Sequence, residues 1–140
     1  MREITKTFTA TARARPRPRP RPRPEARVAR NVLVFDLKTE AEALKFEPPW
    51  KAHGHNAKTL VHRDDLRIVL AAVKKGIRFH QHEHSSSVAI QVATGRVVIH
   101  LASEVVELLP GMILSIAPFL AHEIVAKEFS LLLLTFAAPN

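Results

Sequence analysis

An all-β sandwich or barrel is the fold class that the sequence predicts for residues 31–140. Three observations support it: short β-prone runs follow one another closely, clusters of Asp, Gly, Pro or Ser separate them, and no segment has a long helical pattern. Closely spaced short strands are typical of sandwiches and barrels, whereas alternating strands and helices would indicate a parallel sheet. The expected strands are residues 58–62, 66–73, 77–83, 88–94, 96–101, 104–108, 112–117 and 129–136.

The segment before the strands predicts one further β-prone stretch and one short helix. Residues 32–35 (VLVF) are β-prone. Thr39 with Glu42 three residues later fits a capping box, in which each residue satisfies a free amide at the start of a helix. We expect this helix to run to about Phe46 and to end before the two prolines at 48–49.

Residues 1–30 form a basic tail that accounts for the whole net charge of +8. They contain ten Lys or Arg and two Glu, whereas residues 31–140 carry eleven basic and eleven acidic side chains. The alternation of Arg with Pro predicts a disordered, extended tail, because proline prevents helix and sheet pairing. The alternative is a weak, salt-sensitive anchor for nucleic acid or an acidic partner. A neutral folded domain excludes a basic DNA-binding fold.

Composition also limits the compartment and the chemistry. The chain has no cysteine, which excludes disulfides, thiolate metal sites and a cysteine nucleophile. The longest apolar run, residues 108–121, is shorter than a bilayer span and contains two prolines and a glycine, so we expect no membrane segment. No secretory signal is evident at the N-terminus, and we expect a cytoplasmic protein.

Three histidines stand at alternate positions, in His80-Gln81-His82-Glu83-His84. Side chains two residues apart on a strand project to the same face, so these imidazoles can converge. The flanking spacing is more specific: five residues separate Gly76 from His82, three separate His84 from Val88, and six separate Val88 from Gly95. Isolated histidines elsewhere, such as His62 and His100, we interpret as structural.

With one departure, this spacing is the first motif of the cupins, and the sequence resembles that family. Gly111 precedes His122 by eleven positions, as glycine precedes histidine in the second cupin motif. Among cupins the chain is similar to a group of small single-domain bacterial proteins. The similar segments are LRIVL at 66–70, IQVATG at 90–95 and AHEIVAK at 121–127.

The resemblance implies a double-stranded β-helix, the cupin or jelly-roll barrel, over residues 31–140, with a metal in its mouth. His82, His84 and His122 are the implied ligands, for one divalent transition metal: Fe, Zn, Ni, Cu, Co or Mn. Val88 replaces the glutamate of the first motif. In the second motif the proline, glycine and asparagine positions hold Ala117, Phe119 and Ala126.

Losing the glutamate leaves two interpretations: the metal is lost, or a neutral three-histidine site remains. Such a site would favour a small anionic ligand, because no protein carboxylate offsets the metal charge. The resemblance therefore implies an oxygenase or related oxidoreductase acting on a small anionic molecule. The alternative is a non-catalytic small-ligand sensor or metal-binding module. Either way, we expect a homodimer.

Other residues are candidates for the same site by position along the strands. His80 is a possible additional ligand, although a bulge or a polar lining role fits it better. Arg78 shares the parity of the histidines and would meet an anionic substrate on a regular strand. The residues expected to line the substrate pocket are Val88, Ile90, Phe79, Phe119 and Arg78.

Overall fold

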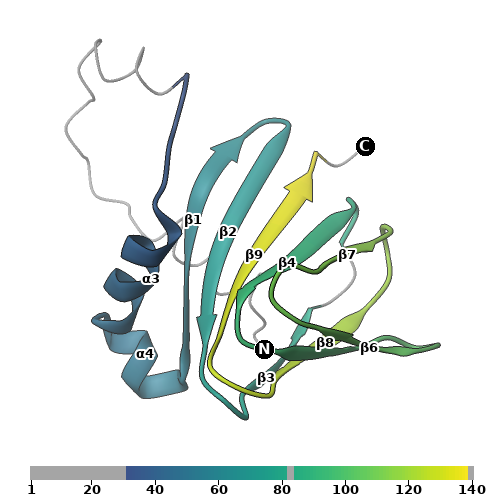
Figure 1. The fold of residues 1–140 in the computed structure, drawn as a ribbon. Helices are drawn as coiled ribbons and strands as arrows, with labels where there is room; N and C mark the ends of the chain where they lie inside the picture. Colours follow the sequence, from purple (N-terminus) through teal and green to yellow (C-terminus); the bar gives the residue numbers. More distant parts are fainter. Residues whose placement is uncertain (1–30, 82–83, 139–140) are drawn as a thin grey trace.

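The computed structural model describes residues 31–81 and 84–138. In this part of the chain two helices precede nine strands, which form two antiparallel sheets packed face to face (Figure 1). The strands are β1 (His55–Arg63), β2 (Leu66–Val73), β3 (Arg78–Gln81), β4 (Val88–Thr94), β5 (Val97–His100), β6 (Val105–Leu108), β7 (Ile113–Ile116), β8 (His122–Ala126) and β9 (Ser130–Ala137).

The two sheets share the strands unequally. The five-stranded sheet has the order β1-β2-β9-β4-β7, and the four-stranded sheet has the order β3-β8-β5-β6. Neighbours in the sheets are therefore distant in sequence, as where β9 lies between β2 and β4 (Figure 1). This antiparallel two-sheet arrangement confirms the predicted all-β class.

The main core lies between the two sheets. Every second residue of β2 points into it, from Val69 through Ala71 to Val73, and all three are essentially inaccessible. Leu132 and Leu134 of β9 lie on the same inner face. On both strands every second side chain thus points into the interior that the two sheets share.

A second apolar layer lies on the outer face of the five-stranded sheet, under helices α3 (Leu37–Lys45) and α4 (Pro48–His53) (Figure 1). Leu44 of α3 is buried there against residues of β1, β2 and β9, and Trp50 of α4 contacts Phe129 edge-on at 5.9 Å between ring centroids. The helices therefore cover only the outer face of this sheet, and its inner face borders the core and the barrel mouth.

The helical segment differs from the prediction in two places. Asp36, not Thr39, caps α3, because its Oδ1 accepts hydrogen bonds from the amides of Lys38 and Thr39. The helix ends before the prolines as predicted, but a second helix, α4, which was not predicted, begins at Pro48, since a first helical turn needs no amide hydrogen from proline.

Two strands have the predicted bounds, and six others begin or end one to three residues away from the predicted bounds. The expected bounds 66–73 and 88–94 are confirmed, and one strand, β8, was missed. Residues 32–35 were predicted to be β-prone but form no strand, and Val32 and Val34 are 75% and 89% exposed. The predicted tail, residues 1–30, lies outside the described residues.

None of the described helices combines the length and the apolar character needed to cross a bilayer.

Candidate metal centre

A row of paired residues crosses the five-stranded sheet near its open end. Arg67 of β2 pairs with Phe136 of β9, Phe136 pairs with Val88 of β4, and Val88 pairs with Ile116 of β7. Phe136, Val88 and Ile116 belong to the inner core, so the row faces inward. Arg67 shares this face, because it alternates in step with Val69. The inner wall of the mouth is therefore apolar except for one arginine.

His122 lies on the opposite sheet, at the first residue of β8, directly across from Gln81 of β3. It is 4% exposed, and its Nδ1 lies 3.3 Å from the carbonyl oxygen of Leu120. Burial lowers the pKa of His122, partly offset by the hydrogen bond to Leu120, and a further small decrease comes from the nearby His84. A backbone carbonyl on Nδ1 orients the ring and leaves Nε2 for a metal.

His84 follows β3 and reaches the same region. Its carbonyl oxygen accepts a 2.7 Å hydrogen bond from the amide of Phe119, three residues before His122. Its ring centroid lies 5.0 Å from that of Phe136 on the inner wall. Burial lowers the pKa of His84, and the charge of Arg67 lowers it further.

The two histidines fit a metal by their chemistry. The charge of His84 contributes to lowering the pKa of His122, and both pKa values are lowered, chiefly by burial. Both rings are therefore neutral at pH 7, the form in which imidazole binds a transition metal. His82, the remaining implied ligand, lies outside the described residues. Among the residues that the structure describes, no group of three or more His, Cys, Asp or Glu side chains could hold a metal.

His80 and Arg78 lie on the outer face of β3, away from His122. Side-chain exposure is 66% for His80 and 65% for Arg78, and both approach the Glu123 carboxylate, at 3.3 and 3.5 Å. Alternation was expected to place them inward, but on β3 it is Phe79 that faces inward: it pairs with the buried Ile124 and is itself 6% exposed. His84 reaches the interior only beyond the end of the strand.

The expected pocket-lining residues divide in the same way. Val88, Ile90 and Phe79 are buried in the core between the sheets. Phe119 is 63% exposed and lines a separate hollow of about 500 Å³, together with residues of β7. Its φ of 65° lies in the left-handed region, which favours glycine. Phe119 occupies the position of the glycine in the second motif.

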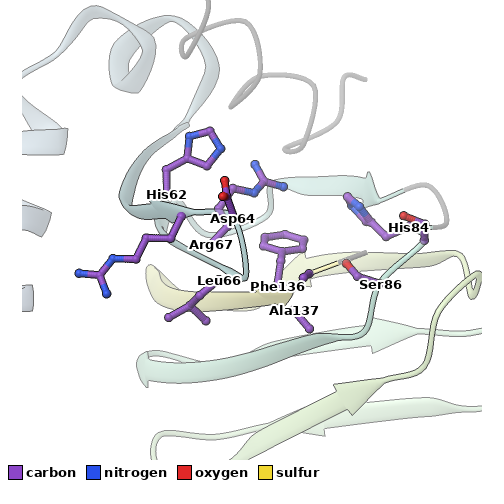
Figure 2. A pocket seen from close by; sticks show the side chains of 11 residues that line it. His62, Asp64, Leu66, Arg67, His84, Ser86, Phe136 and Ala137 are labelled. Carbon is purple, nitrogen blue, oxygen red and sulfur yellow. The ribbon is translucent and has the colours of Figure 1, made fainter. Parts of the chain in front are cut away.

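A pocket of about 370 Å³ opens beside His84, where β1 turns into β2 and β9 ends (Figure 2). Its lining includes His62, Asp64, Arg67, Ser86 and Phe136. Figure 2 shows the Arg67 and His84 side chains flanking the Phe136 ring, and the central guanidinium carbon of Arg67 lies 4.4 Å from the ring centroid. Burial lowers the pKa of Arg67, although the group stays protonated.

The sequence analysis assigned no role to Arg67, and it interpreted His62 as structural. A usable signal for Arg67 was present: it is the one charged residue in β2, and it shares parity with the buried Val69 and Ala71. The signal for His62 was weaker, because an irregularity between Thr59 and Val61 shifts the register of β1. Alternation counted from the start of that strand therefore misplaces its last residues.

Solved structures resemble this architecture at low sequence identity. A conserved protein of unknown function from Streptococcus pyogenes is 23% identical, with a TM-score of 0.63 over 77% of this chain and 89% of that one. A cupin superfamily protein from Desulfitobacterium hafniense is 19% identical, with a TM-score of 0.57 over 60% and 77%. The protein has the cupin fold.

A larger cupin-like match is a variant of salicylate 1,2-dioxygenase from Pseudoaminobacter salicylatoxidans, at 16% identity and a TM-score of 0.65. The match covers 74% of this chain and 34% of the dioxygenase. At such identities the likeness shows the fold alone. No protein-family model matches the sequence, and no curated protein matches it either. Within the cupin fold, the paired row containing Arg67 and the buried His122 face each other across the barrel mouth.

Proposed function

We propose that this cupin binds one divalent transition metal through His82, His84 and His122, and that it acts on a small anionic molecule there. The observation that carries the proposal is the pair His84 and His122. The hydrogen bond from the Phe119 amide to the His84 carbonyl joins their two segments, and both imidazoles are partly or fully buried with lowered pKa values. Neutral imidazoles held together at a barrel mouth are suitable ligands for Fe, Zn, Ni, Cu, Co or Mn.

Val88 gives this site its electrostatic character. It is 4% exposed and lies between Phe136 and Ile116 on the inner wall, where the family motif carries glutamate. With valine there, a bound divalent metal would keep most of its charge and would supply a Lewis acid with open positions for oxygen or substrate. Arg67 adds a further positive charge on the same wall. Both features favour an anionic substrate.

The chain's own residues orient and dehydrate the site. The Leu120 carbonyl holds the His122 ring, and the Phe119 amide holds the backbone of His84. Phe136 covers one side of the His84 ring. Apolar cover of this kind keeps water from competing with a bound substrate.

Oxygenase or related oxidoreductase chemistry is the catalytic form of this proposal. The fold likeness to a dioxygenase is compatible with it, but fold similarity does not by itself define an activity. The non-catalytic form, a small-ligand sensor or metal-binding module, uses the same residues without turnover. The two forms differ only in whether substrate is consumed.

Metal analysis of the tagless full chain tests the metal part. We expect about one equivalent of transition metal per chain in the wild type and a large loss in His122→Ala. The matched control is His100→Ala, because His100 is an exposed histidine on β5. An unchanged metal content in His122→Ala would contradict the proposal. Oxygen uptake by Fe(II)-loaded protein with diketones, thiols and hydroxy acids then separates the catalytic form from the binding form.

Self-association and tail binding are further predictions. The exposed apolar side chains of Val32 and Val34 suit burial against a second copy, and we expect a homodimer. Any nucleic-acid binding is expected to be weak and to need residues 1–30. Sedimentation of the full chain, and binding at low salt by a chain starting at Asn31, would test these two predictions.

A further inference from the structure

Arg67 is an unusual residue for the inner face of this barrel. It pairs with Phe136 across β2 and β9, next to core positions, and it is only partly exposed. Removing a guanidinium from water is unfavourable unless an anion or an aromatic face compensates. Among the described residues no carboxylate lies within ion-pair distance of Arg67, and its one close partner is the Phe136 ring at 4.4 Å. The charge is thus held at the pocket without an anionic partner from the described chain.

Among the described residues, none accepts a hydrogen bond from the Arg67 guanidinium, whose contact is with the Phe136 ring. Stacking on an aromatic ring uses the flat face of a guanidinium, while the N–H groups point outward from its edge. That edge matches a carboxylate, which can accept two parallel hydrogen bonds from it. In Figure 2 the Arg67 guanidinium lies above the Phe136 ring and His84 lies to the right of it, and all three residues line the pocket.

The pocket's charge and size select among anions. Among the described residues that line it, Arg63 and Asp64 are exposed and opposite in charge, which leaves Arg67 as the one partly buried charge apart from the histidines. One surplus charge matches a monoanion better than a phosphate group, which carries nearly two negative charges at pH 7. The volume of about 370 Å³ is at the small end of ligand pockets. Phe136, Leu66 and Ala137 supply apolar lining.

We infer that Arg67 binds the carboxylate of a small monocarboxylic acid, whose apolar body lies beside Phe136 and whose far end faces His84. The inference rests on the proposed function in one respect: it identifies this acid as the anionic molecule on which the metal centre acts. The binding step itself needs only Arg67 and the pocket, so it can be measured separately.

The test uses calorimetric titration of the chelator-treated full chain at pH 7.5. The probes are benzoate, the neutral and nearly isosteric benzamide, and inorganic phosphate. We expect benzoate to bind more tightly than either of the others. Arg67→Met keeps a side chain of similar length over Phe136 but removes the charge and the donors, and it should weaken benzoate about 10- to 100-fold. Thermal unfolding checks that the variant folds.

Two further variants make the outcome specific. Arg63→Met removes an exposed charge from the same lining, and it should change the benzoate affinity less than about threefold. Arg67→Lys keeps the charge but loses the paired donors, and it should weaken the affinity for benzoate about tenfold. If the methionine variant does not fold, the lysine variant takes its place in the test.

Several results would overturn the inference. These are an equal loss in Arg63→Met and Arg67→Met, equal binding of benzoate and benzamide, tighter binding of phosphate than of benzoate, and no benzoate binding to either metal-free or zinc-loaded protein. None of these results depends on the metal content of the purified protein, so the carboxylate site and the metal site are tested separately. Conversely, a metal-free protein that binds benzoate through Arg67 would leave the inferred carboxylate site in place while removing the metal proposal.

Discussion

The backbone carbonyl of His84 accepts a 2.7 Å hydrogen bond from the amide of Phe119. This bond joins the segment after β3 to the segment that leads into His122, so the two histidine-bearing parts of the chain are fixed to each other through the main chain. Phe119 makes the bond with a φ of 65°, which non-glycine residues seldom adopt. Local backbone strain at this position therefore accompanies the approach of the two histidines.

Replacing Phe119 by glycine should stabilise the protein. A non-glycine residue in the left-handed region costs about 1–3 kcal/mol, of which the extra flexibility of unfolded glycine cancels about 0.5–1 kcal/mol. The side chain is largely exposed, so little packing is lost. We expect Phe119→Gly to raise the free energy of unfolding by about 1 kcal/mol in urea denaturation. Phe119→Ala keeps the strained φ and should not raise the free energy of unfolding. If both variants change it equally, backbone strain is not the cause.

The metal-free protein should lose stability in mild acid. Burial lowers the pKa of His84 and of His122 in the folded state, whereas the unfolded chain has ordinary values of about 6.5. Below about pH 6.5 the unfolded state therefore binds more protons, and the contribution present above that pH is lost as the pH falls through the folded pKa values. Urea unfolding with chelator present should give a lower free energy of unfolding at pH 5.5 than at pH 7.5.

The two histidines can be tested as the source of this pH dependence. His122→Gln removes one of the buried titrating groups and should flatten the profile between pH 5.5 and 7.5. His100→Gln, a change at an exposed position, should leave it as in the wild type. Parallel profiles for the wild type and His122→Gln would mean that other groups control acid stability.

Restoring an acidic side chain at position 88 should tighten metal binding. Val88 points into the barrel between Phe136 and Ile116, so Val88→Glu would bring a carboxylate to the inner wall. Without metal, a buried carboxylate should cost about 2–4 kcal/mol of stability. With metal, charge neutralisation should increase the affinity for Zn(II) at least about tenfold, measured by competition with a chelating dye.

Val88→Gln is the matched control for this change, because glutamine has nearly the same shape as glutamate and no charge. It should lose stability without gaining metal affinity. If Val88→Glu binds zinc no better than Val88→Gln, then position 88 does not face the metal site.

Two strands were predicted with their observed bounds, each for its own reason. Strand β2 lies between the core and the helix layer, and β4 begins and ends at clear turn residues, so both were predicted with their observed bounds. Strand β8 was missed because His122, Glu123 and the nearby Lys127 interrupt a short apolar run. Its burial comes from β3 and β5, which pair with it from distant parts of the sequence.

The candidate site was predicted in part, for a similar physical reason. Alternation along a strand indicates which residues share a face, but not which face is inside. For β3 the partner strand decides this: Ile124 is buried, so its partner Phe79 faces inward, while Arg78 and His80 face out. Arg67 shows the converse case, since a single charge in an apolar strand carries no indication of what it binds.

Anomalous diffraction at the cobalt edge, from crystals of the full chain grown with Co(II), would test the central claim most directly. The account predicts one strong peak about 2.0–2.2 Å from ring nitrogens of His84 and His122, with His82 completing the set. A cobalt peak confined to exposed histidines such as His80 or His100, with none between His84 and His122, would contradict it.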